Sequence, residues 1–276
     1  MKLSFSTLSF DEYDFPGLIE VCKQNGYHGI EIRMGTGVGN AAYTAEQLSL
    51  YKSMLDDASI AVTNLGSSVC IRGNNTEQLD EFTSLLPMAK TLGARGIRIF
   101  MGNFRRFTYN DTAPIDYSGC VEWIQQACDT AAGYGVAVYI ETHNEFASGR
   151  ELRKLLDLVK RDNCKIIWDI MHPLEENETP AQTMSYIGRD IAHVHVKDGT
   201  EKTDPQSLEY IYCPIGEGVL PIAEIVSLLQ HIGYDGYFSL EWEEAWRDSL
   251  NTIALPHYEV LRDYAQFMKD IEKSQR

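Results

Sequence analysis

The chain has 276 residues, with 24 Lys and Arg against 40 Asp and Glu, so its formal net charge is −16. Hydrophobic residues make up 44% and charged residues 23%, a composition that argues against intrinsic disorder. Because so acidic a chain repels phosphate backbones and anionic membranes, neither nucleic acid nor membrane is an expected partner. The N-terminus lacks an apolar signal-peptide region, and no apolar run approaches about 18 residues. A cytoplasmic protein is therefore expected.

Short β-rich apolar runs recur along the chain, and stretches with helical periodicity, such as residues 121–131, 152–159 and 261–271, separate them. In chain order the apolar runs cover residues 3–6, 29–33, 60–64, 96–101, 136–141, 165–169, 191–196 and 237–241. Each strand–helix unit averages about 34 residues, the size of a βαβ step. Eight such units predict an α/β protein with one domain over residues 1–276, a single (β/α)8 TIM barrel.

The main alternative is a doubly wound open sheet, which would carry a G-x-G-x-x-G fingerprint after an early strand. Residues 35–40 read Gly-Thr-Gly-Val-Gly-Asn, so Asn40 stands where the third glycine is needed. No helical pattern begins there. The sequence therefore favours the barrel and argues against a dinucleotide site.

In a (β/α)8 barrel the functional residues lie at the C-terminal ends of the strands. Four successive runs finish with an acidic or imidazole side chain, and strand alternation turns these side chains into the barrel. They are Glu141, Asp169, His195 and Glu241. Because three clustered carboxylates repel one another, they predict a divalent-metal site, with Mn²⁺ expected first and Mg²⁺, Co²⁺ or Zn²⁺ as alternatives. Glu243 shares the parity of Glu241 and is the alternative last ligand.

These residues also have a purely structural interpretation. The carboxylates could pair with Arg33, Arg98 or Lys197 in a salt-bridge network that needs no metal. His193 lies one layer below His195 and is expected to fill the barrel interior.

Further candidates surround the strand ends. His143 and His172 are expected in loops, where they could contact substrate or hydrogen-bond neighbouring carboxylates. Lys197 follows His195 at the same parity and is a candidate for substrate contact. The other candidates for hydroxyl contacts are Glu31, Asn64 and Asn103, and the candidates for apolar walls against a sugar ring are Phe104, Trp168, Trp242 and Trp246.

The strand-end series, the run His-Val-His-Val-Lys-Asp at residues 193–198 and the turn Ile-Gly-Glu-Gly at 215–218 together resemble the xylose-isomerase-like barrel superfamily. This superfamily of sugar phosphate isomerases and epimerases includes ketose 3-epimerases, inosose dehydratases and hydroxypyruvate isomerases. The resemblance covers essentially the whole chain. It implies a role for His172 in touching a substrate oxygen near the metal. It also implies metal ligation by Glu141, Asp169, His195 and Glu241, with Glu141 and Glu241 as the acid/base pair.

The resemblance therefore implies a metal-dependent sugar isomerase or epimerase that transfers a proton next to a carbonyl through a metal-stabilised enediolate. Two positions depart from the ketose epimerases: Ala147 replaces a second substrate-binding glutamate, and Glu201 replaces an arginine. An inosose-like keto-polyol dehydratase and a non-catalytic sugar-binding or assembly barrel remain alternatives. The expected partner is a small sugar or polyol, and homo-oligomers of such barrels are common.

Overall fold

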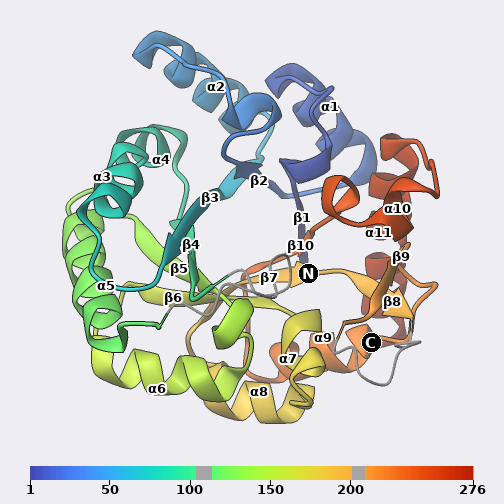
Figure 1. The fold of residues 1–276 in the computed structure, drawn as a ribbon. Coiled ribbons are helices and arrows are strands. Elements are labelled where there is room, and N and C mark those ends of the chain that lie inside the picture. The colour runs from blue at the N-terminus through green and yellow to red at the C-terminus, as the bar shows by residue number, and fades with distance from the viewer. Residues whose placement is uncertain (104–113, 201–208, 276) are drawn as a thin grey trace.

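The computed structural model describes residues 1–103, 114–200 and 209–275, and it contains a closed barrel of parallel strands ringed by helices (Figure 1). The strands follow one another around the barrel in the order β1-β10-β7-β6-β5-β4-β3-β2. This closure confirms the predicted (β/α)8 TIM barrel. The strands are β1 (Lys2–Ser6), β2 (Gly29–Arg33), β3 (Ala61–Ile71), β4 (Gly96–Met101), β5 (Ala137–Glu141), β6 (Cys164–Asp169), β7 (Ile191–Val196) and β10 (Tyr237–Leu240).

Helices cover the outside of the barrel, and several begin at a side-chain cap. Thr44 and Thr179 each form a capping box with the glutamine three residues on, which satisfies N–H groups at the start of α2 and α8. No helix in the described ranges is long and apolar enough to cross a membrane. The helices are α1 (Phe15–Asn25), α2 (Ala45–Asp57), α3 (Thr76–Ser84), α4 (Leu86–Leu92), α5 (Tyr117–Ala132), α6 (Gly149–Val159), α7 (Met171–Glu175), α8 (Pro180–Ile187), α9 (Ile222–His231), α10 (Asp248–Asn251) and α11 (His257–Ser274).

Two C-terminal strand ends differ from the sequence prediction, and β1, β3, β5 and β6 each begin one residue away from it. Strand β3 continues to Ile71 instead of ending at Asn64, because Cys70 and Ile71 pair with β4 beyond a register shift. Strand β10 ends at Leu240, one residue earlier than predicted, although the N–H of Glu241 still donates to the carbonyl of Val196.

An additional antiparallel hairpin, β8 (Asp198–Thr200) with β9 (Ile211–Cys213), lies outside the barrel and was not predicted. The buried Asp198 carboxylate accepts hydrogen bonds from the backbone N–H groups of Gly199, Gly216, Gly218 and Leu220. Any side chain at Gly218 would collide with this carboxylate. Asp198 thereby ties the hairpin to the turn at 215–218 and fixes the backbone next to Lys197.

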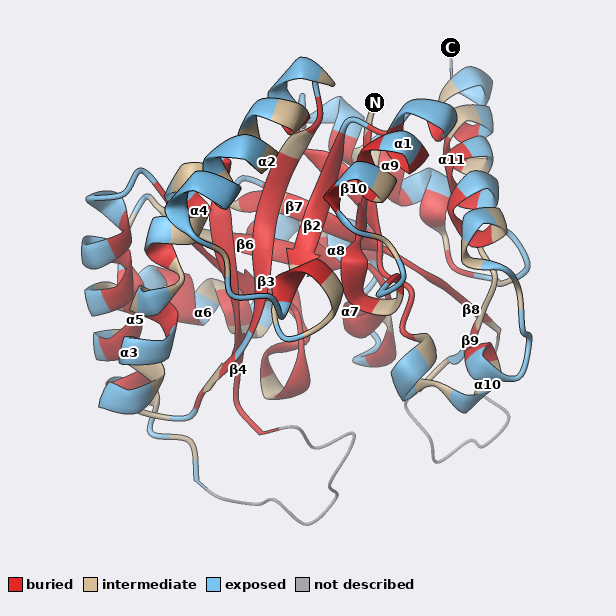
Figure 2. Ribbon diagram, turned by 90° about the horizontal axis from the view of Figure 1, so that it is seen from above, coloured by how far each residue is buried: buried red, intermediate tan, exposed pale blue. Residues whose placement is uncertain are grey.

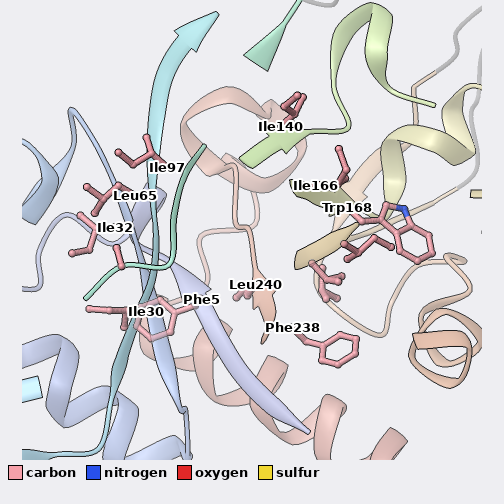
Figure 3. Close-up of a cluster of buried hydrophobic side chains, with 14 of the residues drawn as sticks. Phe5, Ile30, Ile32, Leu65, Ile97, Ile140, Ile166, Trp168, Phe238 and Leu240 are labelled. Carbon is pink, nitrogen blue, oxygen red and sulfur yellow. The ribbon is translucent and has the colours of Figure 1, made fainter. Parts of the chain in front are cut away.

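The hydrophobic core fills the layer between barrel and helices (Figure 2). Alternate strand residues such as Ile140, Ile166 and Phe238 point outward into this layer (Figure 3). Within the described residues none of the six cysteines forms a disulfide bond, and Cys22, Cys120, Cys128 and Cys164 are buried. Burial raises the pKa of Cys22 to about 12. The four buried thiols are therefore part of the packing.

Candidate metal and substrate site

Four potential metal ligands converge at the C-terminal end of the barrel. Glu141 and Asp169 end β5 and β6, His195 lies near the end of β7, and Glu241 directly follows β10. One ligand atom from each lies within 4.8 Å of the other three, and all four residues are buried. The register explains this convergence, because Asp169 pairs with His195, which in turn pairs with Ser239.

The imidazole of His195 is held in one orientation by Glu31. His195 Nε2 lies 2.8 Å from Glu31 Oε2, and His193 Nε2 lies 3.1 Å from the same oxygen. Because an ionised carboxylate only accepts, His195 Nε2 must carry a hydrogen. Glu31 was expected to contact substrate hydroxyls, but it is fully buried, where it orients His195 and lies beside His193.

This orientation leaves His195 Nδ1 facing the carboxylates of Glu141 and Glu241, at 3.7 and 3.4 Å. Within the described part of the chain Nδ1 makes no hydrogen bond, although it is buried. A second-shell carboxylate that fixes the tautomer of an imidazole is a recurrent feature of metal sites. Three carboxylates with one such nitrogen fit a divalent cation.

The salt-bridge network considered from the sequence is present at the same place. Lys197 Nζ lies 2.6 Å from Asp169 Oδ2 and 2.6 Å from Glu241 Oε2. Arg98 Nη1 lies 3.0 Å from Glu141 Oε2 and 3.2 Å from Glu241 Oε1. The metal interpretation and the salt-bridge interpretation therefore involve the same carboxylates.

Burial and these charges act together on the protonation of the cluster. Burial raises the pKa of Asp169 to about 6, although Lys197 opposes this shift. Burial disfavours the charged form of His195, but the carboxylates of Glu241, Glu31 and Glu141 outweigh it and raise the His195 pKa well above its usual value. A metal bound at Nδ1 would have to displace a proton, so metal affinity would depend on pH.

Glu243, the alternative last ligand, belongs to a different group of contacts. It interacts with Lys197, and Arg247 Nε donates to its Oε2 at 2.9 Å. The candidate metal-binding group to which Glu243 belongs also contains Asp169 and His172. The structure brings Glu241, not Glu243, together with the other three predicted ligands.

His143 and His172 lie beside the cluster. His172 was expected in a loop but lies on α7, which begins directly after β6. Its Nδ1 is 2.6 Å from the carbonyl oxygen of Thr142, so Nδ1 carries the hydrogen. His143 Nδ1 lies 2.7 Å from Asn144 Oδ1, and the two imidazole rings meet edge to face at 4.7 Å.

A cavity of about 420 Å³ opens above the cluster, a size that suits a small molecule. Leu8, Ser68 and Phe100 were not predicted as lining residues, although Phe100 shares the parity of Arg98 on β4. The lining residues are Leu8, Arg33, Ser68, Arg98, Phe100, Glu141, His143, Glu241, Glu243 and Trp246.

The three tryptophans predicted as apolar walls lie in different places. Trp246 lines the cavity and is 57% exposed. Trp168 is not a wall: it points outward into the core between barrel and helices (Figure 3). The alternation that turns Asp169 inward turns Trp168 outward. Trp242 is buried, and its indole N–H donates to Glu244.

The two predicted asparagine contacts have different surroundings. Asn64 is buried in the middle of β3, where the hydroxyl of Thr63 donates to its Oδ1, and its Nδ2 makes no hydrogen bond within the described residues. Asn103 follows β4, and its side-chain and backbone N–H groups donate to Glu145. Phe104 and Glu201 lie outside the described residues.

These features define a TIM barrel with a candidate divalent-metal site under a small cavity. The family model of the xylose isomerase-like TIM barrel matches residues 19–270, and the chain belongs to this family. Hydroxypyruvate isomerase of Escherichia coli is 22% identical over 255 residues, which cover 86% of this chain and 91% of that protein. An uncharacterized protein of Methanocaldococcus jannaschii is 28% identical, but the match covers only 53% of this chain and 48% of that protein.

Solved structures share the whole fold. The IolI protein with a bound zinc atom has a TM-score of 0.80 and 19% identity, and the match covers 98% of each chain. D-Psicose 3-epimerase from Clostridium cellulolyticum H10, solved with D-tagatose, has a TM-score of 0.77 and 19% identity, with 99% of each chain covered. The relatives with a named activity support an enzyme of this superfamily.

Proposed function

We propose that the protein is a divalent-metal-dependent isomerase or epimerase of a small carbohydrate, which transfers a proton at the carbon next to a carbonyl. The observation that carries this proposal is the placement of Glu141 and Glu241. Both line the cavity, and both belong to the candidate metal cluster. Their strands, β5 and β10, are separated around the barrel by β6 and β7, so the two carboxylates reach the cavity from different sides.

Glu141, Asp169, His195 and Glu241 would hold the cation, for which Mn²⁺ is our first choice. A bound divalent cation supplies Lewis-acid polarisation of a carbonyl oxygen and stabilises the negative charge that develops there. The protein's own part is proton transfer, in which one glutamate removes the proton and the other returns one from the opposite face. General acid–base catalysis of this kind contributes about 10²–10⁴-fold.

Arg98 would position this pair. One guanidinium nitrogen contacts both glutamates, and the ring of Phe100 lies 4.4 Å from the guanidinium carbon. These contacts favour the ionised glutamates and limit their motion, which a base and a metal ligand both require. Substrate would bind in the cavity that Arg98 lines. We propose that His143 and Trp246, which also line this cavity, contact it there. Lys197 and His172 lie deeper, beside the carboxylates.

The test is hydrogen exchange into candidate substrates. Hydroxypyruvate, D-fructose and D-psicose are incubated with the protein and MnCl₂ in D₂O, and deuterium next to the carbonyl is followed by NMR. We expect exchange with at least one compound and its loss by about 10²-fold or more in Glu141→Gln and Glu241→Gln, each checked for a native circular dichroism spectrum. The exposed Glu217 provides the control Glu217→Gln. Product formed without exchange, or full activity in both variants, would refute the two-glutamate scheme.

A further inference from the structure

Resting on the proposed function, we propose that the substrate carries an anionic group, a carboxylate or a phosphate, and that Arg33 binds this group in the cavity. Arg33 lines the cavity but has no role in the proton-transfer scheme.

Arg33 is a half-buried cation that makes no ion pair with a carboxylate of the described residues. It ends β2 and lines the cavity. Its Nη1 donates to the carbonyls of Met34 and Gly66 at 2.5 and 2.9 Å, and its Nη2 donates to Ser68 Oγ at 2.7 Å. Among the described residues no carboxylate oxygen lies within 4.0 Å of its guanidinium nitrogens. Placing a charge in a protein without a counterion is unfavourable, so an anion would complete this site.

The donors of Arg33 are also only partly used. A guanidinium has five N–H groups, and the neighbouring carbonyls and hydroxyl accept three of them. Nε–H and one Nη2–H make no hydrogen bond within the described chain. Two donors in the fixed plane of a guanidinium match the two oxygens of a carboxylate or phosphate.

Glu241, Glu31 and Glu141 favour the charged form of Arg33 through space, but each of these carboxylates contacts another cation. Glu31 holds His193 and His195, and Glu141 and Glu241 contact Arg98. Burial, followed by the positive charge of Arg98, lowers the pKa of Arg33 to about 10. The guanidinium is still charged at neutral pH, which means that the charge persists in an unfavourable setting.

The backbone leaves room for this arrangement at Gly66. A Cβ atom there would lie 2.9 Å from Glu31 Oε1, and 3.6 Å from both Arg33 Cδ and Arg98 Cζ. Glycine therefore leaves room for the Glu31 carboxylate, while both arginines pass β3 at ordinary contact distance. Leu8, Phe100 and Trp246 supply apolar walls around them. A small molecule with an anionic end and a carbonyl near the glutamates fits this distribution, as in a short keto acid, a sugar acid or a sugar phosphate.

The experiment compares three matched ligands that differ at one end. Glycerate, glycerol 3-phosphate and glycerol share a three-carbon skeleton, and because none has a ketone or aldehyde carbonyl, their binding is independent of turnover. Affinities are measured by isothermal titration calorimetry on the Mn²⁺-treated full chain. The variants are Arg33→Gln and Arg33→Lys. The control is Arg95→Gln, because Arg95 is exposed at the other end of β4 and lies over the Tyr237 ring.

We expect glycerate or glycerol 3-phosphate to bind at least about tenfold more tightly than glycerol. Arg33→Gln should lower the affinity for the anion by about 10- to 100-fold and leave the affinity for glycerol unchanged. Arg33→Lys should recover part of the lost anion affinity. The preferred anion identifies carboxylate or phosphate. A purely structural Arg33 would weaken all ligands alike, and equal affinity of the wild type for glycerol and both anions would also overturn the proposal.

If Arg33→Gln does not fold, the salt dependence of the wild type decides: anion binding should weaken with rising NaCl while glycerol binding does not, and no salt effect would refute the charge contact. Anion selectivity without hydrogen exchange in any keto compound would uphold the Arg33 site and count against the proposed isomerase chemistry.

Discussion

Replacing Lys197 by methionine tests whether a metal ion and the lysine ammonium compensate the same carboxylates. Methionine keeps an unbranched apolar side chain and removes the charge. The Lys197 ammonium lies 2.6 Å from oxygens of both Asp169 and Glu241, and all three side chains are buried. Glu241 keeps Arg98 as a partner after the substitution, whereas Asp169 loses its nearest cation.

The size of the effect follows from these contacts. Removing one partner of a buried ion pair costs about 3–5 kcal/mol. Because Glu241 keeps a partner and Asp169, with a pKa of about 6, takes up a proton readily, we expect the lower end, about 3 kcal/mol. A ligand that binds only the folded state at 100 times its Kd returns about 2.7 kcal/mol. Metal should therefore restore most of the lost stability.

The measurement is urea unfolding followed by circular dichroism near pH 7.5, with EDTA or with MnCl₂. Lys197→Met should be destabilised in EDTA and gain more from Mn²⁺ than the wild type, in which the ion competes with the ammonium. The control Lys165→Met should change stability by less than about 1 kcal/mol, because Lys165 Nζ is 3.8 Å from Asp190 and its side chain is 33% exposed. Equal destabilisation with and without Mn²⁺, and no metal effect on the wild type, would show that lysine and arginine alone compensate the carboxylates.

Three further predictions concern the surroundings of the site. Glu31→Gln should weaken Mn²⁺ binding by about 10–100-fold in calorimetric titrations, because it loosens His195, and an unchanged affinity would count against His195 as a ligand. Asp198→Ala should lower the free energy of unfolding by about 3 kcal/mol or more, since several backbone N–H groups lose a charged acceptor, and a loss below about 1 kcal/mol would contradict this role. At His257, burial disfavours the charge, but hydrogen bonds to Glu244 and a second glutamate outweigh it and raise the pKa. The charge therefore stabilises the fold below about pH 6.5 and this stabilisation is lost as pH rises through the folded-state pKa, so the stability difference between wild type and His257→Gln should shrink with rising pH in urea titrations.

Strand periodicity and chain order were enough to predict the barrel and the convergence of Glu141, Asp169, His195 and Glu241. Both depend on local rules: side chains alternate along a strand, and parallel strands end on one side of a barrel. The same alternation places Trp168, the neighbour of the inward-facing Asp169, on the outside of the barrel. It therefore contradicts the expectation that Trp168 is an apolar wall of the site.

Other parts of the site depend on contacts between distant segments, which periodicity does not encode. Asn64 was expected at a strand end, but β3 continues because Cys70 and Ile71, six and seven positions on, pair with β4. The role of Glu31 depends on His193 and His195, more than 160 residues away. Arg33 and Arg98 were both candidate ion-pair partners. The structure shows that Arg98 pairs with Glu141 and Glu241, whereas Arg33 pairs with no carboxylate of the described residues.

The buried thiols give this barrel a built-in reporter of local opening. Cys22 lies in α1, Cys120 and Cys128 in α5, and Cys164 in β6, so they sample separate parts of the helical shell and the barrel wall. Alkylation requires an accessible thiolate, which burial denies to each of them until its segment detaches. Timed labelling and mass spectrometry can therefore rank the opening of these segments in the unmodified chain, with the less buried Cys70 as the reference.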